Sequence, residues 1–265
     1  MPESLPTDFE SRRSLAEYVA AISPWRTPTE PSPFRGGRRA ALERLDAIQP
    51  LDYVRTRNHL DGAVTRLSPY IRHGILSLRE VREAAVDRFG APKRYEKFVQ
   101  ELAWRDYWQR LYRARPQWIW QSIEPYKTGY TEADYREDIP GDVLRGESDA
   151  ASINDFIHRL ESTGYLHNHA RMYLAAYLVH WRRIRWQSGA RWMLDRLLDG
   201  DPASNNLSWQ WVASTFSRKP YIFNLANVQK YTGQDVDTRP ATNPSLDASY
   251  EELTERLFPM LGSTP

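Results

Sequence analysis

Helix signals recur along almost the whole chain, and no segment shows the alternation of apolar and polar residues that a half-buried strand needs. Ser77 and Glu80 form a capping-box pair ahead of an apolar repeat of helical period. Asp201 and Pro202 begin another helix with an N-cap residue followed by a proline in the first turn. There is no β-branched run that demands a sheet. The sequence therefore predicts an all-α protein.

The same signals divide the chain into a short arm and one helical domain. Residues 1–35 are rich in proline and predict a loosely attached arm with one helical stretch near 9–22. Residues 36–265 predict the domain, with a long loop region and a short helix between 116 and 150. Further helices are expected at 36–48, from Ser68-Pro69, from Ser77, and at 93–113, 151–162, 167–183, 189–198, 202–215, 220–231 and 246–261.

Composition excludes several classes of protein. The 265 residues include no cysteine, which rules out disulfides, thiolate zinc sites and iron–sulfur clusters. No apolar run is long enough to cross a bilayer, and the N-terminus lacks the apolar core of a signal peptide. We expect a cytoplasmic protein with no membrane insertion and no metal.

The basic residues are unevenly chosen. Of the 36, 31 are arginine and 5 are lysine, while the net charge is only +2. A GC-rich genome would explain the arginines alone. Together with 10 tryptophans and 15 tyrosines they favour planar, anionic ligands, because guanidinium groups bind phosphate and stack on rings.

Two stretches in the first half carry side chains suited to a ligand. Thr65 and Arg66 precede a predicted N-cap at Ser68, which suggests a pyrophosphate site, although an ordinary capped helix has the same pattern. In "FVQELAWRDYWQR", a carboxylate, two indoles and a guanidinium share one helical face, which could equally hold an inter-helix ion pair shielded by tryptophan. These four residues are Glu101, Trp104, Arg105 and Trp108.

Two stretches in the second half continue the pattern. Helical spacing aligns Asn168, Arg171, Met172 and Ala175 along one stripe, which lines either a cavity or the solvated end of a core helix. In "DGDPASNNLSWQWVAS", Asn205 and Trp209 lie four residues apart on one face. Capping explains one of Asp199 and Asp201 but not both, so a ligand with N–H groups is the alternative.

Taken together, four stretches resemble the FAD-binding domain of the photolyase/cryptochrome family in order and spacing. They are "TRLSPYIRHGILSLRE", "ELAWRDYW", "STGYLHNHARM" and "DGDPASNNLSWQWVAST", and the resemblance spans roughly residues 35–230. It implies a helical domain that holds FAD folded into a U. The antenna domain of the family has no counterpart here, so no antenna chromophore is expected.

The resemblance also implies residue roles. The implied cofactor-binding residues are Tyr53, Thr65, Arg66, Leu67, Ser68, Phe98, Glu101, Arg105, Tyr165, Asn168, Arg171, Asp199, Asp201 and Asn205. The implied catalytic residues are Glu101, Asn168, Met172, Trp186 and Trp209, the last two as inner members of an electron-transfer chain. Trp104 and Trp211 are implied to clamp a flipped pyrimidine dimer, and Tyr130 or Tyr135 could replace the missing outer tryptophan.

The sequence departs from the family pattern where DNA and the flavin would lie. Two glycines close to the flavin are replaced by Leu207 and Ser208, the Trp of "STGW" is Tyr165, and the arginine after the active-site asparagine is His169. The segment "PYIFNLAN" lacks an arginine that grips DNA.

Three functions fit this sequence. The first is light-driven splitting of pyrimidine dimers in DNA, with single-stranded DNA preferred because a flipped base then needs no unpairing. The second is a cryptochrome-like flavoprotein that senses light or redox state and signals to an unknown partner. The third is a helical nucleic-acid-binding or scaffold protein with a relic pocket.

Overall fold

The computed structural model describes residues 5–23 and 32–262. In that part of the chain the only strand-like pairing is an isolated bridge between Arg136 and Ile184, so the all-α prediction is confirmed. The α-helices are α1 Arg12–Ile22, α2 Arg38–Asp46, α3 Pro50–Thr56, α4 Ser68–Arg72, α5 Leu78–Phe89, α6 Glu96–Ala114, α7 Gly141–Arg145, α8 Ala151–Thr163, α9 Asn168–Ala176, α10 Trp186–Leu194, α11 Pro202–Ala213, α12 Leu225–Tyr231 and α13 Tyr250–Leu257.

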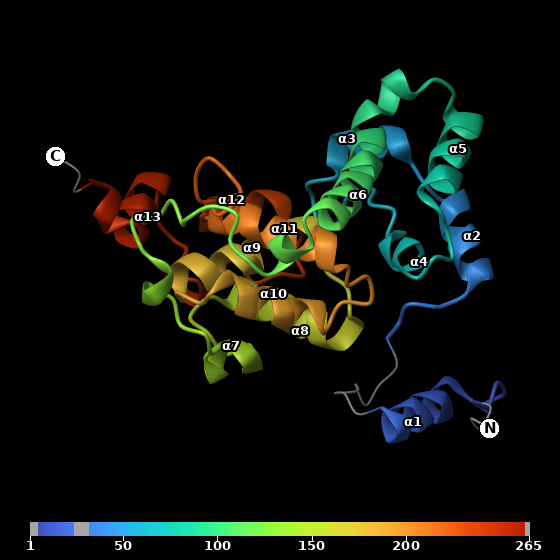
Figure 1. Cartoon of the computed structure of the whole chain (residues 1–265), viewed down its shortest axis with the longest axis horizontal. Helices are drawn as coiled ribbons and strands as arrows, with labels where there is room; N and C mark the ends of the chain where they lie inside the picture. The colour runs from blue at the N-terminus through green and yellow to red at the C-terminus, as the bar shows by residue number, and fades with distance from the viewer. Residues whose placement is uncertain (1–4, 24–31, 263–265) are drawn as a thin grey trace.

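The helices gather around two hydrophobic cores. The larger core joins α8 to α12 around side chains such as Phe156, Tyr173 and Trp186, and the smaller one joins α2 to α6 around Leu67 and Phe98. Figure 1 shows these groups side by side, with α6 reaching from the smaller group to α11. The Gln109 amide of α6 donates to the Asp201 carboxylate at 2.7 Å. This bond ties the C-terminal half of α6 to the start of α11.

The arm contains the one helix that the sequence predicts there. α1 begins at Arg12, where Ser11 and Ser14 form a capping box, and none of its residues is buried. In Figure 1 it lies apart from the other helices. Residues 1–4 and 24–31 of the predicted arm lie outside the described residues. The division into an arm and a domain stays a prediction.

Helix starts with strong capping signals were predicted correctly. The capping box of Ser77 and Glu80 begins α5, and the Asp201 carboxylate accepts the Ser204 N–H at the start of α11. The prediction for Ser68 was wrong: Ser68 is the first helical residue of α4, and Leu67 takes the N-cap position without a side-chain cap. The Thr65 hydroxyl accepts the Leu67 N–H instead, in a tight turn just ahead of α4.

Tertiary contacts shift three other boundaries. α10 begins at Trp186, three residues before the predicted start at 189, and α9 ends at Ala176. The chain then continues as a π-helical turn, Tyr177–Trp181, inside the larger core. The long predicted helix at 93–113 is instead a 3₁₀ turn at Pro92–Tyr95 followed by α6. The 116–150 segment holds two short 3₁₀ turns and α7, as its loop composition predicted.

No helix among the described residues is long and apolar enough to cross a bilayer.

Candidate functional site

A cavity of about 110 Å³ lies between α6, α9, α10 and α11. Its wall combines charged, amide and apolar side chains from segments far apart in the sequence. Eight of the residues implied by the resemblance line it: Arg105, Asn168, Arg171, Met172, Asp199, Asp201, Asn205 and Trp209. The sequence thus predicted more than half of the residues that line the cavity, although these residues meet only in the folded chain.

The centre of the cavity wall is a buried ion pair. The Arg171 guanidinium donates to both oxygens of Asp199 at 2.9 and 2.8 Å, and the side chain of Asp199 is only 3% exposed. Burial acts to raise the pKa of Asp199, but attraction to Arg171 and a bond from the Ser68 hydroxyl outweigh it and hold that pKa below its usual value. Asp199 is therefore ionised at neutral pH.

Arg105 brings a second positive charge to the cavity. Burial lowers the pKa of its guanidinium, although Asp201 and Asp199 act in the opposite direction. It forms no hydrogen bond with the part of the chain that the structure describes, whereas Asp201 is fully engaged by Gln109 and Ser204. A buried guanidinium with unused N–H groups suits an anionic or carbonyl-bearing ligand.

The Asn205 amide is oriented by its neighbours. Its nitrogen donates to the Ala190 carbonyl at 3.0 Å and to the Asn206 side chain at 2.9 Å. These bonds use both N–H groups and leave the Asn205 carbonyl oxygen as the acceptor at the cavity wall. An acceptor there fits a ring N–H of a ligand.

Trp209 forms the floor of the cavity and is 2% exposed. A Cβ atom added at Gly189 would lie 2.4 Å from two carbons of the Trp209 ring, so the glycine makes room for the indole. Trp186 lies one turn before Gly189 on α10 and is fully buried. Its indole N–H donates to the Ser122 hydroxyl at 3.0 Å. Both implied electron-transfer residues therefore adjoin α10.

The implied phosphate-binding segment lies next to the cavity. Arg66 adopts a left-handed backbone with φ of +53°, and its guanidinium lies 5.9 Å from the Tyr165 ring centre. Arg171 lies 5.5 Å from the same ring. Thr65, Leu67 and Ser68 complete this segment. Two guanidinium groups thus lie at the Tyr165 ring, and because Arg171 is paired with Asp199, Arg66 is the one of the two suited to a phosphate.

Glu101 lies outside the enclosed cavity. Its carboxylate pairs with Arg57 and with Lys97, each at 3.1 Å, so the inter-helix ion pair considered from the sequence is present. Burial and the neighbouring Glu101 raise the pKa of Tyr53 to about 12, and the Tyr53 ring meets Phe98 edge-on at 5.4 Å. These three implied residues therefore form a group of their own between α3 and α6.

We define the rim as Glu101, Trp104, His169 and Trp211, which flank the lining residues along the same helices. Trp104 and Trp211 are 47% and 43% exposed. His169 stacks edge-on against Tyr173 at 5.4 Å, and burial, Arg57 and His59 lower its pKa to about 4. The His169 ring is therefore neutral at pH 7 and offers no charge to a phosphate.

Several lining residues escaped sequence reasoning. Ser204 and Val212 lie on the α11 face that carries Ser208, which the family resemblance places close to the flavin, so helical spacing could have found them. Met193 and Leu197 come from the end of α10 and beyond, and only the folded structure brings them to the cavity.

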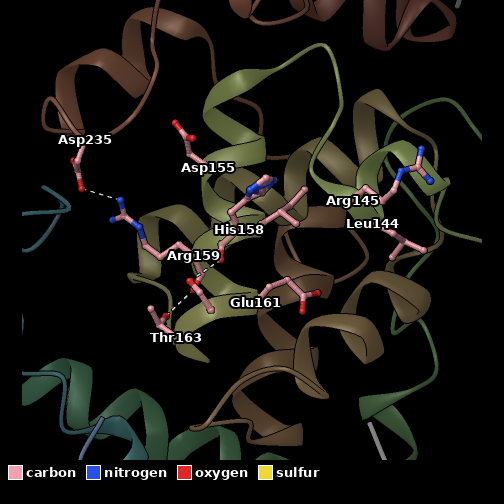
Figure 2. Close-up of a pocket in the computed structure, with 10 residues that line it drawn as sticks. Leu144, Arg145, Asp155, His158, Arg159, Glu161, Thr163 and Asp235 are labelled. Atoms are coloured by element: carbon pink, nitrogen blue, oxygen red, sulfur yellow. Dashed lines mark hydrogen bonds and ion pairs between the residues drawn. The ribbon is translucent and has the colours of Figure 1, made fainter. Parts of the chain in front are cut away.

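A wider hollow of about 820 Å³ lies on the outer side of α8 and contains none of the implied residues. Figure 2 shows residues that line it, among them the Arg159–Asp235 ion pair, whose atoms lie 2.7 Å apart. Most of its lining residues are polar or charged and it is far more open than the smaller cavity, so the smaller cavity is the candidate site.

The donor set of the cavity fits an FAD molecule. It offers buried guanidinium groups for phosphate or ring oxygens, an amide acceptor for a ring N–H, and Met172, Met193 and Trp209 for an aromatic ring system. The enclosed volume is below the roughly 300–1,000 Å³ of ligand pockets, so FAD must extend past the lining toward Arg66. Among the described residues no group of three side chains could hold a metal ion.

Comparisons with known proteins identify an FAD-binding domain. The family described as the FAD binding domain of DNA photolyase matches residues 98–240. A deoxyribodipyrimidine photo-lyase of Streptomyces griseus is 36% identical over 70% of this chain and 40% of its own length. A cryptochrome DASH of Idiomarina loihiensis is 28% identical over 75% of this chain and 46% of its own.

A solved structure shares the fold. The archaeal photolyase of Sulfolobus tokodaii, described with two FAD molecules, has a TM-score of 0.67 and 26% identity over 89% of this chain and 59% of that one. The chain spans about half or less of the length of the curated relatives compared here.

Proposed function

Because the chain belongs to the family of the FAD-binding domain of DNA photolyase, we propose that it binds FAD in the cavity between α9 and α11 and uses it to split pyrimidine dimers in DNA. The observation that carries this proposal is the lining itself. The buried Arg171–Asp199 pair, the oriented Asn205 amide and the Trp209 floor lie around one cavity.

In this proposal the protein binds and orients FAD and the pyrimidine dimer, and the cofactor supplies the redox chemistry. A bound, reduced FAD would supply light-driven one-electron chemistry, in which the electron that opens the cyclobutane ring would return to the flavin. Arg66 would neutralise the diphosphate, Arg171, held by Asp199, would lie beside the flavin, and the Asn205 carbonyl would accept a ring N–H. Met172 and Asn168, at the cavity mouth, contact the flipped dimer, and the Asn168 amide already meets the Met172 sulfur at 3.6 Å.

The rim supports a DNA substrate that is already unpaired. Trp104 and Trp211 are exposed aromatic rings suited to a flipped base. The neutral His169 removes one phosphate contact implied for the family. A weaker grip on the backbone favours single-stranded DNA, where the dimer enters the cavity without the cost of unpairing.

Electron supply is proposed to run through Trp209 and Trp186. Tyr126 lies beyond them: its hydroxyl accepts the Trp186 backbone N–H at 3.3 Å, and its ring stacks on Tyr135 at 4.1 Å. Arg183 lies 3.6 Å over the Tyr130 ring. The same guanidinium is 6.0 Å from the Tyr135 ring, and because the closer cation disfavours oxidation more strongly, Tyr135 is favoured over Tyr130 as the outer member.

The test is photorepair. FAD-loaded, reduced protein is exposed to blue light with a dimer-containing single-stranded oligonucleotide, and loss of the dimer is measured. We expect repair that slows in Glu101→Ala while most flavin stays bound. Trp209→Phe should nearly abolish photoreduction by an external thiol but leave repair by chemically reduced protein intact.

A cryptochrome-like sensor is the second candidate. The observation that favours it is the altered flavin side of α11, where the buried Leu207 and the cavity-lining Ser208 replace two glycines of the family pattern. Flavin that is bound and photoreducible, with no repair of any DNA, would select this function.

A further inference from the structure

A strip of aromatic side chains runs along α6 away from the cavity. Trp104 stacks on Trp108 at 5.4 Å and meets Tyr107 edge-on at 5.5 Å. Trp108 in turn lies 6.0 Å from Phe216, which lies 6.4 Å from Trp118. We call these five residues the aromatic strip. It joins α6 to the turn that follows α11, two elements that Figure 1 also places together.

The aromatic strip is not part of either hydrophobic core. None of its members is buried, and Trp104 and Tyr107 are 47% and 45% exposed. Five neighbouring rings that stay open to water cost solubility, and such a contiguous patch marks an interaction surface. The strip is continuous with the cavity, since Trp104 directly precedes the cavity-lining Arg105.

Cations flank the aromatic strip. Arg115 is the residue that directly follows α6, eleven residues after Trp104. Its guanidinium is 5.9 Å from the Trp118 ring. Arg218 and Lys219 are exposed and come two and three residues after Phe216. The nearby Asp106 is neutralised by Arg110 at 2.7 Å, so the charge around the strip is positive.

We propose that the aromatic strip binds the unpaired nucleotides on one side of the dimer that enters the cavity. Bases of any sequence stack on the rings, because every base has a π face, and Arg115 with the Arg218–Lys219 pair contacts phosphates. The positive charge favours a nucleic acid strand over an apolar protein partner. This inference rests on the proposed function, because the strip serves the same DNA substrate as the cavity.

The test uses the fact that the aromatic strip lies on one side of the cavity, so it should bind nucleotides on only one side of the dimer, either 5′ or 3′. FAD-loaded full-length chain is titrated with three ligands: a bare thymine-dimer dinucleotide, and single-stranded oligonucleotides with the dimer at the 5′ end or at the 3′ end. Tyr107→Ser and Phe216→Ala should each weaken binding of one of the two oligonucleotides by roughly tenfold. The other oligonucleotide and the bare dimer should bind as they do to the wild type.

Three controls separate the strip from general damage. Tyr107→Phe keeps the ring and should bind like the wild type. Arg115→Gln should reduce the salt dependence of binding of the same oligonucleotide that the ring variants affect. Leu144→Ser replaces an exposed apolar side chain of α7 and should change nothing.

The outcomes distinguish the inference from the proposed function. If the wild type binds and repairs the bare dimer but binds all three ligands equally well, the strip assignment is overturned and the repair function stands. If the oligonucleotides bind in the predicted one-sided way without any repair, the strip assignment stands and the repair function fails. Binding of none of the three overturns both.

Discussion

The cavity and the rim occupy the same helices, yet they keep different amounts of the family pattern. In the cavity, Arg171, Asp199 and Asn205 are all present and fixed by hydrogen bonds to one another or to neighbouring groups. At the rim, Glu101 is held by two cations and a neutral His169 stands where the family has an arginine. This contrast indicates that holding the cofactor and gripping DNA are separable requirements on this fold.

Breaking the central ion pair of the cavity should have the largest effect. Arg171→Met leaves Asp199 charged, buried and unpaired, which should lower the free energy of unfolding by about 3–5 kcal/mol. It should also release the flavin. Urea unfolding and flavin absorbance measure the two effects.

The matched control is Arg110→Met, which breaks the exposed Arg110–Asp106 pair at 2.7 Å. It should cost no more than about 1 kcal/mol. Equal losses in the two variants would contradict the distinction between the cavity and the surface.

A buried histidine behind the cavity should make stability depend on pH. The His180 Nε2–H donates to the Val212 carbonyl at 3.0 Å, and burial lowers the pKa of His180 to about 4. The folded state keeps the ring neutral, whereas the unfolded chain takes up a proton below about 6.5. The stability contribution is therefore complete above pH 6.5 and is lost as the pH falls toward 4, by up to about 3 kcal/mol.

Replacing this histidine tests the assignment. His180→Asn should flatten the slope of unfolding free energy against pH by up to about 1.4 kcal/mol per pH unit between pH 4 and 6.5. His167 and His169, whose pKa values are also lowered to about 4, should keep part of the slope. An unchanged slope would mean that His180 is not neutral in the folded protein.

A substitution beside Trp209, at the floor of the cavity, should destabilise the protein less than breaking the central ion pair. Gly189→Ala places a methyl group where the Trp209 ring lies and should destabilise the chain by about 1–3 kcal/mol. Displacing Trp209 should also slow photoreduction of the flavin. Gly36→Ala, where a Cβ meets no atom within 4 Å, is the control and should leave both measurements unchanged.

The smallest predicted effect lies at the rim. His169→Arg should restore one phosphate contact, which raises the slope of log affinity against log salt by roughly 0.7–0.9 for DNA. Flavin content should not change, because His169 does not line the cavity. A variant that loses flavin would show that rim and cavity are coupled.

The parts of the fold that the sequence predicted are those with local causes. The capping box at Ser77 and the Asp201-Pro202 start depend only on neighbouring residues. The start of α4 was predicted one residue late, because the Thr65 hydroxyl accepts the Leu67 N–H in a turn that makes Leu67 the N-cap and Ser68 the first helical residue. The break from α9 into a π-helical turn depends on packing in the larger core.

In the candidate site, too, the pairs of residues close in sequence could be predicted and the pairs far apart in sequence could not. Helical spacing placed Asn205 with Trp209 and Asn168 with Met172, because each pair lies on one helix. The partners of the charged groups lie far away in sequence: Arg57 meets Glu101 across 44 residues and Gln109 meets Asp201 across 92. No local pattern contains such pairs, so only the folded chain reveals them.

The most direct test of this separation is the rate of light-driven dimer splitting on single-stranded and duplex DNA, measured with the same FAD-loaded, reduced protein. With an intact cavity and a weakened grip on the backbone, repair should be faster on single-stranded DNA, and His169→Arg should narrow the difference. Failure to repair either substrate while reduced flavin remains bound would contradict the account and favour the cryptochrome-like sensor.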